Sequence, residues 1–236
     1  MADRGRSTTL SDQTPYNRHG TLTSMDPATD WVTRDGYACL DFDGSNDYVS
    51  TPATGVVSSY AQRTIMGWLR IGSTGANQAL WGSGRTTGLS GAFLRISSAN
   101  KVQYFENSGA YNVAGATSLT TGVWYHVAAA RTVNGVIIYL NGKEDGTDSS
   151  RSAATDTQDT TDLIGAIWSS GSVANNFTGH IASVSLYAGT QPAALIQLAA
   201  SRIGIEFERT RIRTRATAAA APPSSTSGNL LLLGVG

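Results

Sequence analysis

The chain has 236 residues, with 17 basic and 17 acidic side chains, and charged residues make up 14% of it. A formal net charge of zero gives no overall attraction to nucleic acid or to an acidic membrane, and no apolar run approaches the roughly 20 residues of a spanning helix. A single cysteine, Cys39, excludes an internal disulfide. The 26 glycines and the many Ser and Thr residues predict an all-β chain with short strands and tight turns.

Residues 1–36 are polar and turn-rich, and they contain no apolar run of the kind that a secretory signal needs. The first clear strand covers residues 37–43, where Leu40 and Phe42 alternate with polar neighbours. The turn after it places Asp43, Asn46 and Asp47 close together. These oxygen-bearing side chains could hold calcium, or they could cap the turn through its own backbone.

Residues 63–71 carry apolar side chains on both faces, which predicts a central, covered strand. A short strand is expected around Leu80 and Trp81. Residues 92–97 and 102–105 should pair with each other across Asn100 and Lys101. Sequential antiparallel pairing of this kind is typical of a β-meander.

A hairpin is the most informative stretch. Residues 122–131 and 136–143 are rich in β-branched and aromatic side chains, and Asn134-Gly135 lies between them, which strongly favours a tight turn. Residues 144–162 are polar and predict a loop, and residues 163–168 predict another strand.

Pro192 precedes an apolar stretch over residues 193–200 that predicts one short helix. From residue 201 the composition changes to an arm with a basic stripe and an apolar end. We interpret both parts as partner-docking, on this or another protein, through Arg209, Arg211, Arg213, Arg215, Leu230, Leu231, Leu232 and Leu233. Four leucines in a row are far too few to cross a bilayer.

Three segments resemble laminin G-like domains, which are concanavalin A-like and pentraxin-like jelly rolls. The hairpin GVWYHVAAARTVNGVIIYLNGK is similar to their central hairpin, and LDFDGSNDYVS at residues 40–50 is similar to a second signature. The segment at residues 175–200 resembles their closing strand, although Ala182 and Ser183 replace the usual Asp-Glu pair. If that pair helps to hold a cation in relatives, this chain lacks the contribution.

The resemblance implies a two-sheet antiparallel β-sandwich of the concanavalin A-like jelly-roll type, with extended N- and C-terminal arms. We expect a lead and first strand region over residues 1–36, the laminin G-like domain over 37–200 and the arm over 201–236. By this resemblance, aromatic side chains could stack on sugar rings, although strand aromatics are more often core. The candidates are Trp68, Trp81, Tyr104, Tyr111 and Trp168.

The sequence offers no catalytic set. Jelly-roll glycosidases need two carboxylates on one strand facing one cleft, whereas Glu106 is isolated and Glu144 lies in a predicted loop. There is no nucleophile elbow, no phosphate loop and no zinc spacing. We therefore predict a protein that is not an enzyme, and calcium is the one cofactor that the residues suggest.

Two functions fit these features. The first is a virion structural protein, a phage capsid decoration or tail-associated protein, which displays the lectin-like domain and docks through its arm on other virion proteins as an oligomer. It would be assembled in the host cytoplasm and could bind cell-surface glycans. The alternative is a free, extracellular bacterial module that binds carbohydrate or protein, with the arm as an ordinary tail. Neither hypothesis involves nucleic acid or a membrane.

Overall fold

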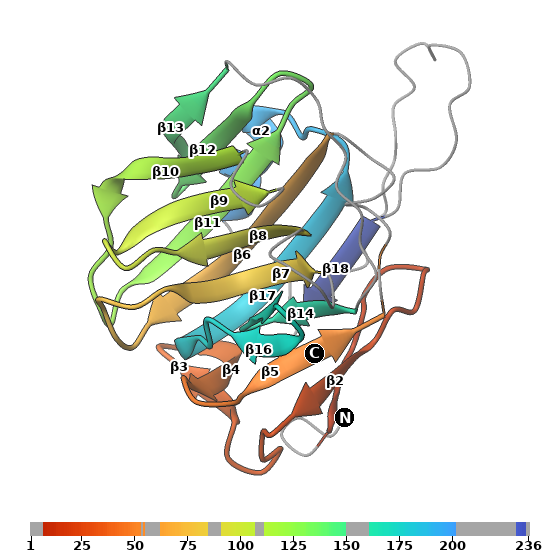
Figure 1. The fold of residues 1–236 in the computed structure, drawn as a ribbon. Coiled ribbons are helices and arrows are strands. Elements are labelled where there is room, and N and C mark those ends of the chain that lie inside the picture. The colour runs from red at the N-terminus through yellow and green to blue at the C-terminus, as the bar shows by residue number, and fades with distance from the viewer. Residues whose placement is uncertain are drawn as a thin grey trace.

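The computed structural model describes residues 7–52, 54, 62–84, 91–106, 111–149, 161–201 and 230–234. Two large antiparallel sheets pack face to face, and the helix α2 (Ala193–Ala200) lies outside one of them (Figure 1). The β-sandwich predicted from the sequence is therefore confirmed. Within the described ranges, none of the helical segments could span a bilayer.

Sheet A is the first layer and contains strands from both ends of the domain. Across the sheet the order is β1 (Thr9–Leu10), β2 (Gly20–Thr23), β5 (Tyr48–Thr51), β14 (Asp162–Ile164), β7 (Gln78–Gly84), β8 (Gly91–Ile96), β9 (Lys101–Glu106) and β10 (Tyr111–Ser118). A separate hairpin of β15 (Ile167–Ser169) and β16 (Ser172–Ala174) contacts β7. The predicted pairing around Asn100 is confirmed as β8 with β9.

Sheet B is the second layer and includes the longest strand. Its order is β13 (Lys143–Asp148), β12 (Val136–Leu140), β11 (Trp124–Arg131), β6 (Arg63–Ile71), β17 (Thr178–Ala188), β4 (Tyr37–Asp43) and β3 (Trp31–Arg34). The strand β18 (Leu230–Gly234) pairs with β17 on the same side as β4. As predicted, β6 is central, since β11 and β17 flank it.

The core fills the space between the two sheets. β6 contributes Ile65 and Leu69, which have no exposed surface. From sheet A, Trp81 and Tyr104 point into the same cluster and are equally buried. Fully burying a large side chain contributes on the order of 2 kcal/mol, so this single cluster is the main source of stability.

The predicted central hairpin is confirmed by the register of β11 and β12, in which Arg131 pairs with Val136. The turn between them closes with a hydrogen bond from the Thr132 amide to the Gly135 carbonyl at 2.8 Å. The Asn-Gly signal therefore located the turn correctly. Glycine is needed at position 135 because a Cβ there would collide with the Asp148 carbonyl of the neighbouring strand.

Two segments differ from the prediction. The polar stretch that begins at residue 144 is not a loop throughout, because β13 pairs with β12 along the edge of sheet B, where polar side chains remain in solvent. The expected strand over residues 163–168 is two strands in different sheets. Gly165, at φ +81°, turns the chain between them, and a Cβ there would collide with the Phe42 ring.

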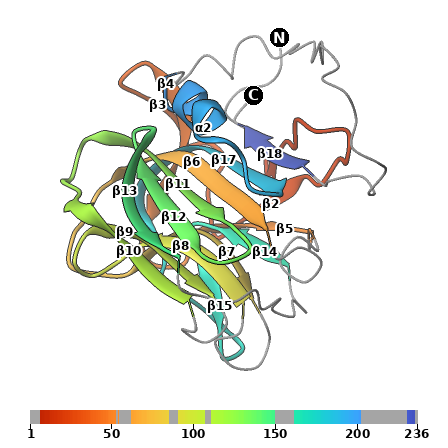
Figure 2. The ribbon, with the colours of Figure 1, turned by 90° about the horizontal axis from the view of Figure 1, so that it is seen from above.

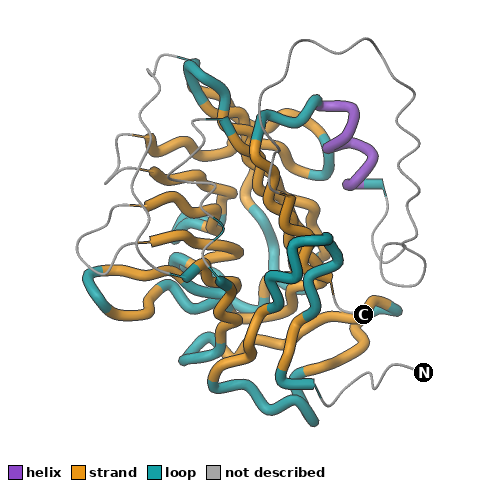
Figure 3. Tube along the Cα trace, turned by 90° about the vertical axis from the view of Figure 1, so that its right-hand side faces the viewer, coloured by secondary structure: helices purple, strands orange, loops and turns teal. Residues whose placement is uncertain are grey.

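The helix predicted over residues 193–200 is confirmed as α2, and it covers the outward face of sheet B (Figure 3). Ile196 is its fully buried residue and packs with Met66, Ala128 and Tyr139. The Trp68 indole donates a hydrogen bond to the Ala199 carbonyl at 3.2 Å. The helix is thus held by the buried Ile196, with Leu195 and Ala199 packed beside it, and by a side-chain hydrogen bond to its last turn.

A charged network bridges the two sheets inside the sandwich. Glu106 of sheet A forms ion pairs with Arg63 and Arg131 of sheet B, and its distance to Arg131 Nε is 3.0 Å. The Tyr104 hydroxyl donates to Glu106 at 2.8 Å, and Arg63 Nε donates to the Tyr104 oxygen at 3.0 Å. All four side chains are completely buried. Glu106, which looks isolated in the sequence, is therefore an internal counterion.

Candidate functional site

The outward face of sheet B is covered by the chain itself. α2 packs on one part of it, and the turn between β3 and β4 reaches another part. Asp35 in that turn accepts a hydrogen bond from Trp124 Nε1 at 3.1 Å and forms an ion pair with Arg70 at 3.4 Å. The polar groups of Asp35, Trp124 and Arg70 are therefore engaged with one another on this face.

His180 on β17 belongs to the same covered face. Its Nε2 accepts a hydrogen bond from Arg34 Nε at 3.2 Å and lies 3.5 Å from Asp41 Oδ1. Burial lowers the pKa of His180, and the Asp41 carboxylate opposes that effect. A neutral imidazole is consistent with a nitrogen that accepts from arginine, so we assign His180 a structural role in holding the β3–β4 hairpin.

The outward face of sheet A carries a different cluster. Phe93 on β8 and Phe105 on β9 are directly opposite each other, and their rings stack at a centroid distance of 4.6 Å and an interplanar angle of 12°. The Arg95 guanidinium lies 5.2 Å from the Phe93 centroid and 5.7 Å from the Phe105 centroid. Both distances are within the range of a cation–π interaction.

Arg95 is held in place by a hydrogen bond but has no ionic partner among the described residues. Its Nε donates to Gln103 Oε1 at 2.7 Å, and Gln103 in turn donates to Asn112 on β10. Within the described ranges no carboxylate lies within 4.0 Å of its guanidinium, and partial burial lowers the pKa of Arg95. The terminal nitrogens of a planar donor fork of this kind are able to bind a ligand with two oxygens side by side.

The β15–β16 hairpin borders this face beside β7. Ile167 packs over Gly82, where a Cβ would collide with the isoleucine side chain. Ile167 also belongs to the same apolar cluster as Phe93, with Ala174 at its margin. The candidate site is therefore a surface formed by Phe93, Arg95, Gln103, Phe105 and Asn112, with a raised hairpin on one side.

The predicted sugar-stacking aromatics do not form one site. Trp81 and Tyr104 have no exposed surface, which corrects their assignment, because a buried ring cannot stack on a sugar. Trp68 lies on the outward face of sheet B under the end of α2. Trp168 is half-buried on β15, and the Tyr111 side chain lies outside the described residues.

The predicted calcium turn is capped by its own carboxylates. Asp43 accepts a hydrogen bond from the Ser45 amide at 2.7 Å, which lowers the pKa of Asp43. Asp47 accepts from the Asp43 amide at 2.9 Å, and burial raises the pKa of Asp47. Asn46 is exposed in the same turn, and its amide donates a longer bond to Asp43, at 3.4 Å. Among the described residues no group of three His, Cys, Asp or Glu side chains could hold a metal, so calcium stays a prediction here.

The structure places only one part of the predicted docking arm. Arg209, Arg211, Arg213 and Arg215 lie outside the described residues. Leu230, Leu231, Leu232 and Leu233 have a described backbone in β18, which pairs with β17 of the same chain. Their docking on another protein stays a prediction.

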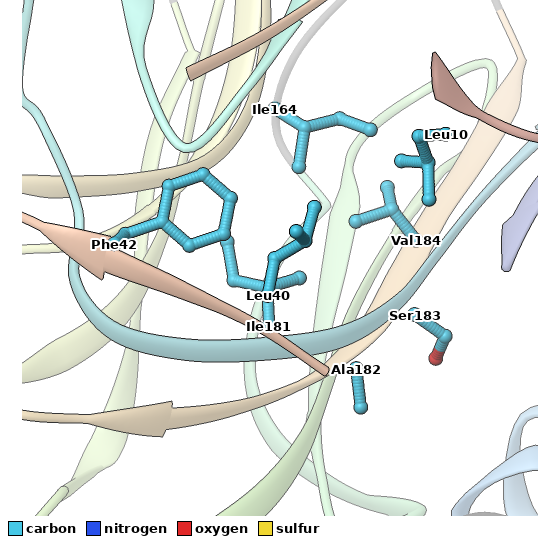
Figure 4. Close-up of a pocket in the computed structure, with 8 residues that line it drawn as sticks. All are labelled: Leu10, Leu40, Phe42, Ile164, Ile181, Ala182, Ser183 and Val184. Carbon is cyan, nitrogen blue, oxygen red and sulfur yellow. The ribbon is translucent and has the colours of Figure 1, made fainter. Parts of the chain in front are cut away.

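An apolar hollow lies between the sheets beside β17. It is lined by Leu10, Leu40, Phe42, Ile164, Ile181, Ala182, Ser183 and Val184 (Figure 4). The Ser183 hydroxyl is the one side-chain polar group in this lining, and it points away from the clustered apolar side chains. A lining of this kind offers no polar group to orient a sugar, so we do not assign ligand binding to the hollow.

The Arg95 cluster was not identified from the sequence, although a signal for it was present. Once strands 92–97 and 102–105 are paired, Arg95 falls opposite Gln103 and Phe93 falls opposite Phe105. Because successive side chains of a strand point to opposite faces of the sheet, these four residues face away from Leu94 and Ile96, which are core residues. The pairing alone does not show that the two rings stack or that Arg95 lies over them.

Comparison with known proteins places this geometry in a family. The family model described as "Concanavalin A-like lectin/glucanases superfamily" matches residues 43–197. No protein of curated function matches the sequence. Several solved structures share the fold at low identity.

Domain 4 of AbnA, a GH43 extracellular arabinanase from Geobacillus stearothermophilus solved with arabinotriose, has 17% identity and a TM-score of 0.59, covering 81% of this chain and 92% of that one. The Ruminococcus gnavus IT-sialidase CBM40 bound to α2,3-sialyllactose has 18% identity and a TM-score of 0.57, covering 69% and 96%. A SAP-like pentraxin from Limulus polyphemus has 14% identity and a TM-score of 0.54, covering 70% and 82%.

The chain spans only 40% of the length of a longer Bacteroides ovatus protein, with 17% identity and a TM-score of 0.49. At these identities the solved structures establish the fold alone. The family model, in contrast, covers more than half of the chain. The chain therefore belongs to the concanavalin A-like lectin/glucanases superfamily.

Proposed function

We propose that this chain is a non-catalytic carbohydrate-binding module whose ligand binds on the outward face of sheet A. The observation that carries the proposal is Arg95, a partly buried cation held over Phe93 and Phe105 with no carboxylate partner in the described part of the chain. An ion that is partly desolvated and unpaired costs free energy, which a ligand oxygen would recover.

The site has the chemistry that sugar recognition needs. The half-buried Phe105 offers an apolar surface for the C–H face of a sugar ring, and the Arg95 fork can donate two parallel hydrogen bonds to vicinal hydroxyls or to a carboxylate. The amides of Gln103 and Asn112 add donors and acceptors beside it. In support, the Ruminococcus and Geobacillus structures of the same fold were solved with bound oligosaccharides.

The proposal of a non-catalytic role rests on the acidic residues that the structure describes. Glu106 is fully buried and ion-paired with two arginines, so it cannot act as a general acid toward a substrate. Asp43 and Asp47 accept hydrogen bonds from turn amides. A glycosidase needs two carboxyl groups facing one cleft, and the Arg95 face has no carboxylate in its lining.

Binding to glycans should depend on Arg95. We expect Arg95→Ala to weaken binding at least about 10-fold, because a charge-assisted bidentate contact contributes about 1.5–3 kcal/mol. A glycan array should first identify a ligand, and calorimetry should then compare Arg95→Ala with Arg70→Ala. Arg70 is the matched control because it lies on the outward face of sheet B, paired with Asp35. Equal affinity of Arg95→Ala and the unmodified protein would contradict this assignment.

We further propose that the module is displayed on a larger assembly, namely a phage particle, with residues 201–236 as the attachment. Support comes from the sequence, where a basic stripe and a leucine run follow the domain. The expected result is that the chain co-purifies with intact particles and that a form without residues 201–236 stays free in the lysate. If the shortened form still joins the particle, the arm is not the attachment. If the full chain is absent from particles, the alternative of a free module is favoured.

A further inference from the structure

The two edges of β17 are occupied differently. One edge pairs with β6 from Gly179 to Ala188. The other edge is shared, because residues 178–181 pair with β4 and residues 183–187 pair with β18 (Figure 2). A segment distant in sequence therefore completes the sheet beside a strand in the middle of the fold.

The change of partner occurs at a β-bulge. Ala182 is the extra residue, since Ile181 pairs with Leu69 of β6 while Ser183 pairs with the adjacent Trp68. β4 pairs with β17 only up to Leu40, and its remaining residues pair with β3 alone. Without β18, the backbone groups of residues 183–187 would form an open edge, which readily accepts another strand.

An apolar floor lies next to this edge. The hollow described above is small and includes Ile181 and Val184 of β17 (Figure 4). Val184 and Leu186 belong to the core and stand opposite Leu233 and Leu231 in the register of β18. The edge thus combines backbone pairing with adjacent apolar positions, the two features that characterise strand addition.

The donor segment is separated from the domain by a long connection. α2 ends at Ala200, and residues 202–229, a stretch of 28, precede Leu230. An extended chain of that length spans up to about 90 Å, whereas a domain of this size is about 40 Å across. The segment can therefore reach the β17 edge of a copy that touches its own domain.

Pairing within one copy and pairing between copies use the same contacts. Exchanging identical strands changes no hydrogen bond or burial, so the difference in free energy lies mainly in concentration. A tethered segment has an effective concentration on the order of 1 mM. Pairing within one copy therefore prevails in dilute solution. When the concentration of copies also reaches about 1 mM, a strand pairs with a second copy about as often as with its own.

We propose that Leu230–Gly234 is an exchangeable strand that occupies the β17 edge of its own copy when dilute and the β17 edge of a second copy when copies are crowded. Two copies that exchange strands with each other form a closed two-fold dimer, whereas donation from each copy to the next gives a ring or a filament. This inference concerns assembly and is independent of glycan binding.

The test uses cysteine pairs in the full-length chain. Ser185 and Leu232 stand opposite each other in the register, so Ser185→Cys in one chain and Leu232→Cys in another can be linked only between copies. A third chain carries both substitutions. Cys39 can stay, because burial raises the pKa of its thiol to about 12 and leaves it unreactive. The control uses Val133→Cys in place of Leu232→Cys, since Val133 is exposed and takes no part in the pairing of β17 with β18.

We expect brief oxidation to link the doubly substituted chain internally at about 10 µM. The mixed single variants should form a dimer whose yield rises about 50-fold between about 10 µM and 1 mM, as an effective concentration near 1 mM requires. The mixture with Val133→Cys should show no such rise. Internal links without any dimer at the higher concentration would overturn the exchange. A doubly substituted chain that forms no link at all would overturn the pairing of β18 with β17.

Discussion

His126 shows how burial alone sets the chemistry of a side chain in this fold. It lies on β11 with 1% of its surface exposed, and its ring packs edge-on against Trp68 at a centroid distance of 5.4 Å. Its Nδ1 has no hydrogen-bond partner among the described residues. Burial lowers the pKa of His126 from 6.5 to about 4, so the imidazole is neutral at physiological pH.

This pKa predicts a loss of stability in acid. Below pH 6.5 the unfolded chain binds a proton at this position while the folded chain does not, so the free energy of unfolding falls as the pH drops from 6.5 towards 4. The full contribution is about 3 kcal/mol. His126→Phe keeps an aromatic ring at this position but removes the titratable group. It should therefore reduce the difference in the free energy of unfolding between pH 7 and pH 4.5, measured by denaturant unfolding. An unchanged difference between the two pH values would show that His126 is protonated in the folded state.

The roles of single residues were harder to predict from the sequence than the strands and the helix. The turn at Asp43 could be recognised, because Asp caps turns by local hydrogen bonds. Arg95 and Glu106 could not be assigned, since their roles depend on partners in other strands. An arginine in a strand is equally compatible with solvent, with a buried pair such as Arg63–Glu106 and with a cation–π contact such as Arg95–Phe93.

At the level of elements, α2 depends on the sheet that it covers. A helix of eight residues is marginally stable on its own, because its few hydrogen bonds do not offset the conformational entropy lost in forming the first turn. Ile196 is fully buried against sheet B, whereas Leu198 is 48% exposed. Ile196 is therefore the main anchor of the helix, and the partly buried Leu195 and Ala199 pack beside it.

The two positions give a matched pair of substitutions in one helix. Ile196→Ala should lower the free energy of unfolding by about 2–4 kcal/mol, because it removes buried methyl groups and leaves a cavity. Leu198→Ala should change it by less than about 0.5 kcal/mol, since an exposed position loses little buried area. Urea unfolding of both variants measures the difference. Similar losses for the two would mean that α2 is not seated on sheet B as described.

Elements with a strong local pattern were predictable, and those set by distant pairing were not. The β11–β12 hairpin, the central strand β6 and α2 agree with the sequence, because periodicity and turn residues define each of them. β13 is polar and became a strand because β12 offered a free edge. β18 could not be placed, since nothing within Leu230–Gly234 specifies residues 183–187 as its partner.

For the whole molecule, the network around Glu106 joins the two layers. It links β9 of sheet A to β6 and β11 of sheet B through side chains that water does not reach. Charges buried in this way are stable only as a set, because each remaining ion would otherwise lack its counterion. The network therefore couples the unfolding of one sheet to that of the other.

Removing the carboxylate of Glu106 should destabilise the fold. We expect Glu106→Gln to lower the free energy of unfolding by about 3–5 kcal/mol, because it leaves the buried Arg63 and Arg131 without that charge. Asp35→Asn is the control, as it alters the exposed ion pair with Arg70 and should cost less than about 1 kcal/mol. Chemical denaturation followed by tryptophan fluorescence compares the two. A loss of under 1 kcal/mol for Glu106→Gln would contradict the coupling role of the network.

The position of α2 makes the two outer faces of the sandwich different. The helix lies outside sheet B (Figure 3), and Ser201 follows it in the sequence, whereas the Arg95 face is the outward face of sheet A. An attachment that follows Ser201 begins on the sheet B side and would therefore leave the Arg95 face uncovered. Many copies arrayed in this orientation would bind a glycan-coated surface with an avidity about 100-fold or more above that of one copy, even if each single contact were weak.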